Sequence, residues 1–184
     1  DCAKHGVRVI NLDGSGEATM QKKLPEFIKI VKKYGAKCFI FSNGFKMEGQ
    51  YMKDCVDAGL DFYRFSFIGS NQEDYTKWMY NAIGGTYAGI RKNIEEMVAY
   101  VNETKAECVI STYHLITDND KIEEELERYK KIVDDLGVKT EIWKMHNWSG
   151  VYDLKEKKIA ALYSSNTDKM DVLAAEIKSI HNLF

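Results

Sequence analysis

The chain has 184 residues, a formal net charge of −2 and 45 % hydrophobic residues. This length fits one domain, and the apolar fraction can build a packed core, which excludes a disordered or fibrous chain. Basic and acidic residues nearly balance, at 26 and 28, so the charge predicts no binding to nucleic acid or to an acidic membrane surface. The chain is also shorter than the ~250 residues of a complete eight-fold βα barrel.

Strand-like and helix-like patterns alternate along the chain. Short β-branched or aromatic runs predict five strands, at 7–12, 38–41, 62–68, 108–114 and 138–144. Apolar residues at helical spacing predict helices at about 24–34, 47–58, 75–79, 90–101 and 122–136, with a further helix after 153. This alternation predicts a parallel sheet with right-handed crossovers, and the apolar strands suggest cover on both faces.

The four cysteines are Cys2, Cys38, Cys55 and Cys108. They are too far apart for a Cys-x-x-Cys pair, so we expect no metal or cluster motif within the chain. Their wide spread fits the reduced thiols of a cytoplasmic protein. No apolar run approaches the ~20 residues of a membrane span, and no signal peptide is recognisable. We therefore expect a cytoplasmic location and no membrane partner.

Polar residues and glycines gather at the ends of the predicted strands. They occupy positions 13–17, 42–44, 66–69, 112–114 and 144–148. Ligand sites of parallel α/β proteins form at the carboxyl ends of the strands. The sequence therefore predicts a site for a polar ligand at this edge of the sheet.

The segment Gly14-Ser15-Gly16-Glu17 lets the backbone approach a ligand closely, because glycines carry no side chain. It is not a dinucleotide fingerprint, since Thr19 stands where the third glycine would be, and no P-loop Gly-Lys-Ser/Thr follows. A tight strand-to-helix turn explains it equally well. At the last strand end, His146 and Trp148 suggest stacking and hydrogen bonding to a ligand, or a tryptophan that caps the sheet.

Two other strand ends have plain structural explanations beside the functional one. Asn43-Gly44 is a common turn pair, and Ser66 fits a buried serine bonded to the backbone. The other three histidines, His5, His114 and His181, form no metal-ligand pattern, and of these only His114 lies at a predicted strand end.

The order and context of these segments resemble the radical S-adenosylmethionine superfamily. HGVRVINLDGSGEATM, GAKCFIFSNGF and AGLDFYRFSFIGSNQEDYTKW look like the family's second, third and fourth strands with their ends. GIRKNIEEMVAYV is similar to the helix before the fifth strand, and KTEIWKMHNWSG to the sixth strand of members of the SPASM or twitch kind. The likeness covers 1–150 and implies a partial (βα)6 TIM-like barrel that lacks its first strand. Residues 151–184 would form a C-terminal helical segment of unclear role.

The resemblance assigns nine residues to S-adenosylmethionine binding: Gly14, Ser15, Gly16, Glu17, Asn43, Ser66, Lys77, His146 and Trp148. Residues 14–17 would line the amino group of the cofactor, largely through backbone oxygens. Ser66 would face the ribose, and Lys77 would balance the carboxylate. Asn43 would support the site, and the loop at 146–148 would lie near the adenine edge or the substrate.

The family's 4Fe–4S cluster requires Cys-x3-Cys-x2-Cys after the first strand, and this chain has no such motif. Cys2 falls too far downstream to be a ligand, and Ala18 replaces the proline of the family's glycine-rich motif. In the family, an electron from the cluster cleaves S-adenosylmethionine to a 5′-deoxyadenosyl radical that abstracts hydrogen. We therefore expect a fragment whose parent holds the cluster and which is inactive alone.

The leading hypothesis is the central part of a radical S-adenosylmethionine enzyme that orients cofactor and a small-molecule or peptide substrate. The alternative is a non-catalytic small α/β module that binds a nucleotide or sugar through 14–17 and 146–148. A flavodoxin-like hydrolase or transferase has no nucleophile–base pair in its favour. A truncated barrel would expose a strand edge, which predicts a dimer or poor solubility.

Overall fold

The computed structural model describes residues 2–14, 16–79, 85–116 and 122–144. The strands are β1 (Val9–Asn11), β2 (Lys37–Ser42), β3 (Phe62–Ser66), β4 (Val109–Ile116) and β5 (Lys139–Lys144). The helices are α1 (Leu24–Lys33), α2 (Gly49–Asp57), α3 (Gln72–Trp78), α4 (Tyr87–Thr104) and α5 (Ile122–Leu136). Two short 3-10 helices, η1 (Cys2–His5) and η2 (Ala18–Met20), flank β1.

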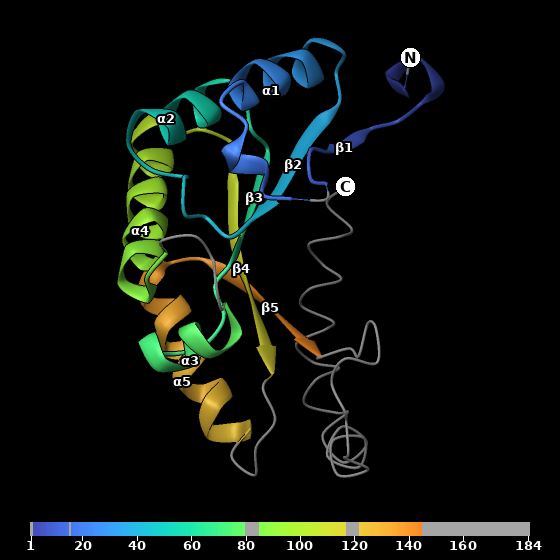
Figure 1. Ribbon diagram of the computed structural model, residues 1–184. Helices are drawn as coiled ribbons and strands as arrows, with labels where there is room; N and C mark the ends of the chain where they lie inside the picture. Colours follow the sequence, from blue (N-terminus) through green and yellow to red (C-terminus); the bar gives the residue numbers. More distant parts are fainter. Residues whose placement is uncertain (1, 15, 80–84, 117–121, 145–184) are drawn as a thin grey trace.

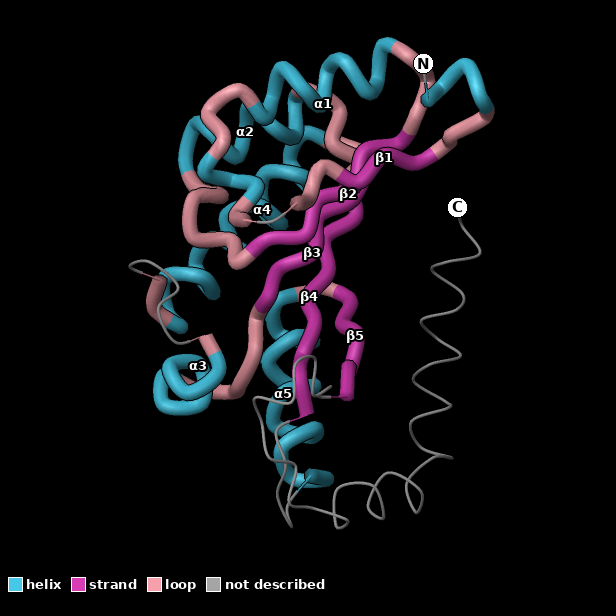
Figure 2. Tube along the Cα trace, turned by 45° about the vertical axis from the view of Figure 1, so that its right-hand side comes forward, coloured by secondary structure: helices cyan, strands magenta, loops and turns pink. Residues whose placement is uncertain are grey.

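The five strands form one parallel sheet in which spatial order follows chain order, β1-β2-β3-β4-β5. The helices that connect them return on the same side of the sheet each time (Figures 1 and 2). Sequential parallel strands with helices on one side are the arrangement of a βα barrel, whereas a doubly wound sheet places helices on both sides. The predicted α/β fold with five parallel strands is confirmed.

The predicted cover on both faces of the sheet is wrong for the described residues, whose helices pack against one face. The alternation of side chains along β2 shows the difference between the two faces. Cys38 and Ile40 are fully buried toward the helices, whereas Phe39 and Phe41 are half-buried on the opposite face. The strands have a continuously apolar sequence because large aromatic side chains occupy that opposite face, and not because a second layer of helices covers it.

The sheet is strongly curved. The ring centroids of Phe41 on β2 and Trp143 on β5 are 6.0 Å apart, although β3 and β4 lie between their strands. In a flat sheet, strands three positions apart would be separated by about 14 Å, at ~4.8 Å for each step. The face that points away from the helices is therefore concave, and we call it the concave face.

The fourth strand is longer than predicted, because β4 continues to Ile116. Thr112 and His114 consequently lie inside the strand, fully buried on its helix side, and not at its carboxyl end. The helix predicted after 153 lies outside the described residues. Among the described helices, none has both the length and the apolarity needed to cross a bilayer.

Candidate functional site

Glu17 joins the loop after β1 to the end of β2. Its Oε1 accepts hydrogen bonds from the Thr19 backbone N–H at 2.9 Å and from the Thr19 hydroxyl at 2.7 Å, which caps η2. The same oxygen accepts from the Ser42 hydroxyl at 2.5 Å, and Oε2 accepts from the Asn43 backbone N–H at 2.9 Å. These four bonds occupy most of the carboxylate's hydrogen-bonding capacity. The side chain of Glu17 therefore connects the loop after β1 to the carboxyl end of β2.

The turn after β2 is held from several sides. The Ser42 hydroxyl accepts from the Gly44 N–H at 2.9 Å, and Asn93 on α4 donates to the Gly44 carbonyl at 2.9 Å. Gly44 has φ +75°, and a Cβ at this position would fall on the ring of Phe65. Position 44 therefore requires glycine, since no larger residue fits there.

The glycine turn after β1 faces open space. The Gly16 N–H donates to the Gly14 carbonyl at 2.9 Å, and φ of Gly16 is +156°, a conformation that is essentially restricted to glycine. A Cβ at either glycine would meet no atom within 4 Å. A cavity of about 250 Å³ borders this turn, lined by Leu12, Gly14, Gly16, Glu17, Ala18, Gln21, Leu24 and Phe27. The backbone of the turn is thus accessible to a ligand.

A buried ion pair crosses the concave face. Arg64 on β3 is only 7 % exposed and donates to Glu141 Oε1 on β5. The other oxygen, Oε2, accepts from Trp143 Nε1 at 2.8 Å. Burial lowers the pKa of Arg64, while the carboxylates of Glu141 and Asp13 raise it. Sequence reasoning missed this pair. The available signal was Arg64, the one charged residue of β3, whereas Glu141 lies in a strand that also contains Lys139 and Lys144.

Aromatic rings surround the Arg64 guanidinium. Its Cζ lies between 5.2 and 5.9 Å from the ring centroids of Phe39, Phe41, Phe62 and Trp143. Cation–π attraction partly replaces the water that the guanidinium loses. Tyr113 extends the group, with its ring 5.0 Å from Phe41 and 4.9 Å from Trp143. The concave face therefore combines an aromatic surface with one polar centre.

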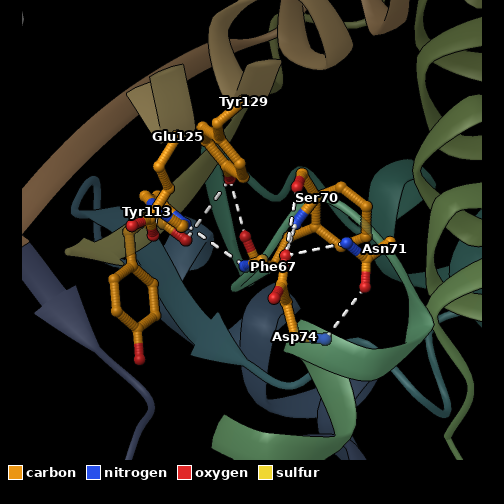
Figure 3. A network of polar contacts seen from close by, with 9 residues as sticks. Phe67, Ser70, Asn71, Asp74, Tyr113, Glu125 and Tyr129 are labelled. Carbon is orange, nitrogen blue, oxygen red and sulfur yellow. Dashed lines mark hydrogen bonds and ion pairs between the residues drawn. The ribbon is translucent and has the colours of Figure 1, made fainter. Parts of the chain in front are cut away.

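A second polar network lies on the helix side of the sheet (Figure 3). His114 accepts at Nδ1 from the Gly69 backbone N–H at 3.2 Å. Because a backbone N–H only donates, the ring proton sits on Nε2, which donates to Glu125 Oε1 at 2.8 Å. The Tyr129 hydroxyl donates to the Phe67 carbonyl at 2.7 Å. These bonds fasten the loop after β3 to β4 and α5, which makes His114 a structural residue within the fold.

The structure brings Gly14, Gly16, Glu17 and Asn43 together at the carboxyl edge of the sheet. Ser66, the last residue of β3, lies at the same edge and is 8 % exposed; the register that pairs Ser42 with Phe65 sets it level with Asn43.

The other predicted site residues lie elsewhere. Lys77 is exposed on α3, with its ammonium 5.1 Å from the ring centroid of Trp78. Ser15, His146 and Trp148 lie outside the described residues.

The described cysteines do not form a cluster site. Cys38, Cys55 and Cys108 are buried, and burial raises the pKa of each thiol to about 12. Cys2 is exposed. Within the described residues, no three His, Cys, Asp or Glu side chains are grouped for a metal ion. An iron–sulfur cluster needs thiolates, which these buried thiols do not supply.

No protein-family model and no curated protein sequence match the chain. Solved structures do match it in fold. SuiB of Streptococcus suis bound to S-adenosylmethionine aligns with a TM-score of 0.63 and 12 % identity, over 92 % of this chain and 39 % of SuiB. A second SuiB structure aligns with a TM-score of 0.66 and 14 % identity, over 95 % of this chain and 38 % of SuiB.

Archaeal TYW1 aligns with a TM-score of 0.50 and 17 % identity, over 73 % of this chain and 42 % of TYW1. These neighbours are radical S-adenosylmethionine enzymes of the TIM-barrel type. The chain spans about two fifths of their length. At these identities, the shared property is the fold.

Proposed function

We propose that the chain binds S-adenosylmethionine at the carboxyl ends of β1 to β3, as the cofactor-orienting part of a radical S-adenosylmethionine enzyme. The observation that carries the proposal is the glycine turn held by Glu17 against Ser42 and Asn43. This turn lies at the edge where parallel α/β proteins bind ligands. The fold is shared with SuiB, which has been solved with S-adenosylmethionine bound.

The chemistry of the edge suits the methionine end of the cofactor. An ammonium group needs acceptor oxygens, and the backbone carbonyls at Gly14 and Gly16 have no side chains to block them. The Gly14 carbonyl accepts from the Gly16 N–H and keeps its second lone pair for a ligand. Glu17 acts as a positioning residue, because its carboxylate is engaged within the protein. The Ser66 hydroxyl at the end of β3 suits a ribose hydroxyl.

The described residues do not fit a three-thiolate iron–sulfur cluster, and we assign no radical step to them. Hydrogen abstraction by the whole enzyme would require cluster ligands from outside this chain. We expect the chain alone to bind the cofactor without turnover. Its contribution would be orientation of S-adenosylmethionine and of the substrate.

Isothermal titration calorimetry on the full chain tests the proposal. S-adenosylmethionine should release or absorb binding heat, and Glu17→Gln should weaken its affinity about tenfold, or 1.4 kcal/mol, because the amide donates where the protein offers donors. Glu26→Gln on the exposed face of α1 is the matched control and should leave the affinity unchanged. Binding of ATP or a sugar in place of S-adenosylmethionine would instead support the nucleotide- or sugar-binding module.

A further inference from the structure

Two buried polar atoms on the concave face have no hydrogen-bond partner among the described residues. They are Arg64 Nε and Ser111 Oγ. Arg64 and Ser111 stand opposite each other on β3 and β4, so their side chains share a face, and they are 7 and 2 % exposed. Buried polar groups normally find a partner, because leaving one unpaired is costly. This pair therefore points to an acceptor atom that a ligand supplies.

The rim of the concave face is an aromatic surface. Trp143 is 39 % exposed, and its indole edge is held by the hydrogen bond to Glu141 Oε2. Tyr113 and Phe41 lie beside it and are half-buried. Apolar walls with a few convergent polar groups are the usual composition of a small-molecule site.

The charges around Arg64 favour an uncharged ligand over a negatively charged one. Arg64 is already paired with Glu141, and the carboxylate of Asp13 also acts on it. Two carboxylates thus face one guanidinium, so a negatively charged ligand oxygen would meet repulsion. An uncharged carbonyl oxygen can accept from Arg64 and Ser111 without that cost.

We propose that the concave face binds an uncharged compound that carries both an aromatic ring and a carbonyl group, such as an arylacetamide. Its ring packs against Trp143 and Tyr113, and its carbonyl oxygen accepts from Arg64 Nε and the Ser111 hydroxyl. The described helices lie on the opposite side of the sheet (Figures 1 and 2). The site goes beyond S-adenosylmethionine binding, because it uses neither residues 14–17 nor the turn after β2.

Three probes of similar shape test the class of ligand by NMR titration of the full chain. 2-Phenylacetamide carries both the ring and the uncharged carbonyl, and should bind with a Kd on the order of 1 mM, as expected for so small a molecule. Phenylacetate exchanges the amide for a carboxylate, and should bind roughly tenfold more weakly. Cyclohexylacetamide lacks the aromatic ring, and should bind at least about threefold more weakly.

Variants locate the site. Ser111→Ala removes one oxygen atom and should weaken phenylacetamide binding roughly threefold to tenfold. Trp143→Leu should weaken it by a similar factor, whereas Trp78→Leu on α3 should leave it unchanged. Circular dichroism verifies that each variant is folded. If Trp143→Leu does not fold, the result for Ser111→Ala decides the test.

Three outcomes would overturn the proposal: no binding of phenylacetamide, equal binding of phenylacetate, or binding that Ser111→Ala leaves unchanged. Calorimetry with S-adenosylmethionine on Ser111→Ala keeps the two proposals distinguishable. The affinity for the cofactor should remain that of the unaltered chain while the affinity for phenylacetamide falls.

Discussion

The Ser42 hydroxyl donates to the Glu17 carboxylate at 2.5 Å, across 25 residues of sequence. This bond fastens the loop after β1 to the carboxyl end of β2. The neighbouring Asn43 N–H donates to the other carboxylate oxygen at 2.9 Å. A side chain that is engaged within the protein thereby sets the position of a glycine turn that borders the cavity.

Ser42→Ala should lower the free energy of unfolding by about 1–3 kcal/mol, because the Gly44 N–H loses its acceptor and Glu17 loses a donor. Urea denaturation measures the change. Ser70→Ala is the control, since the Ser70 hydroxyl bonds to Asp74 at 3.1 Å in a less buried position, and it should cost less than about 1 kcal/mol. Equal decreases in the free energy of unfolding for the two variants would contradict the role of the Glu17–Ser42 hydrogen bond.

Gly44 and Gly35 form a matched pair, with φ of +75° and +74°. A Cβ at Gly44 would fall on the Phe65 ring, whereas a Cβ at Gly35 would meet no atom within 4 Å. Both alanine variants bear the backbone strain, of order 1 kcal/mol, and Gly44→Ala adds about 1–3 kcal/mol of overpacking. Thermal and urea unfolding should therefore rank Gly44→Ala well below Gly35→Ala in stability. The reverse order would show that the turn after β2 can shift freely.

Glu141→Ala should destabilise the chain by about 3–5 kcal/mol, because it leaves the Arg64 charge buried without its ion-pair partner. Glu95→Ala removes a partner from the exposed Arg91–Glu95 pair and should cost under ~1 kcal/mol. The double variant Arg64→Met/Glu141→Leu should recover most of the loss, since apolar side chains of similar volume replace the pair. A double variant no more stable than Glu141→Ala would contradict this account of the concave face.

The buried thiols predict a fall in stability at high pH. Burial raises the pKa of Cys38, Cys55 and Cys108 from 9.0 to about 12 in the folded chain. Between these values the folded state keeps protons that the unfolded state loses, so the free energy of unfolding decreases as pH rises from 9 to 12. Below pH 9 this contribution is fully present.

Thiol counting provides the direct check on those cysteines. At pH 8, a chromogenic disulfide reagent should react quickly with one thiol, the exposed Cys2, and with the other three only after urea is added. Cys2→Ser should abolish the fast phase. Two or more fast thiols in the folded chain would contradict the burial of Cys38, Cys55 and Cys108.

The fold could be predicted from local patterns because each element carries its own periodicity. Strands at period two and helices at period 3.6 appear where the sequence places them, as the alternating burial of β2 illustrates. The site was only partly predictable. The strand-end rule identified Glu17 and Asn43, since it depends on strand direction alone. It did not identify Ser42 as the partner of Glu17, because that contact requires the register between β1 and β2.

Two features depend on three-dimensional context that the sequence does not display. Arg64 and Glu141 are 77 residues apart and meet because the sheet curves. His114 was predicted at a strand end, but β4 continues two residues beyond it and turns the imidazole toward α5. In both cases the sequence displays the polar residue itself, but it does not display the partner that the residue contacts in the fold.

Two-dimensional NMR of the ¹⁵N-labelled chain during titration with S-adenosylmethionine tests the central claim most directly. The account predicts that the amide signals of Gly14, Gly16 and Gly44 shift together with one dissociation constant, while Gly137 at the far end of α5 stays unchanged. Unshifted signals for Gly14 and Gly16 at saturating S-adenosylmethionine would contradict it.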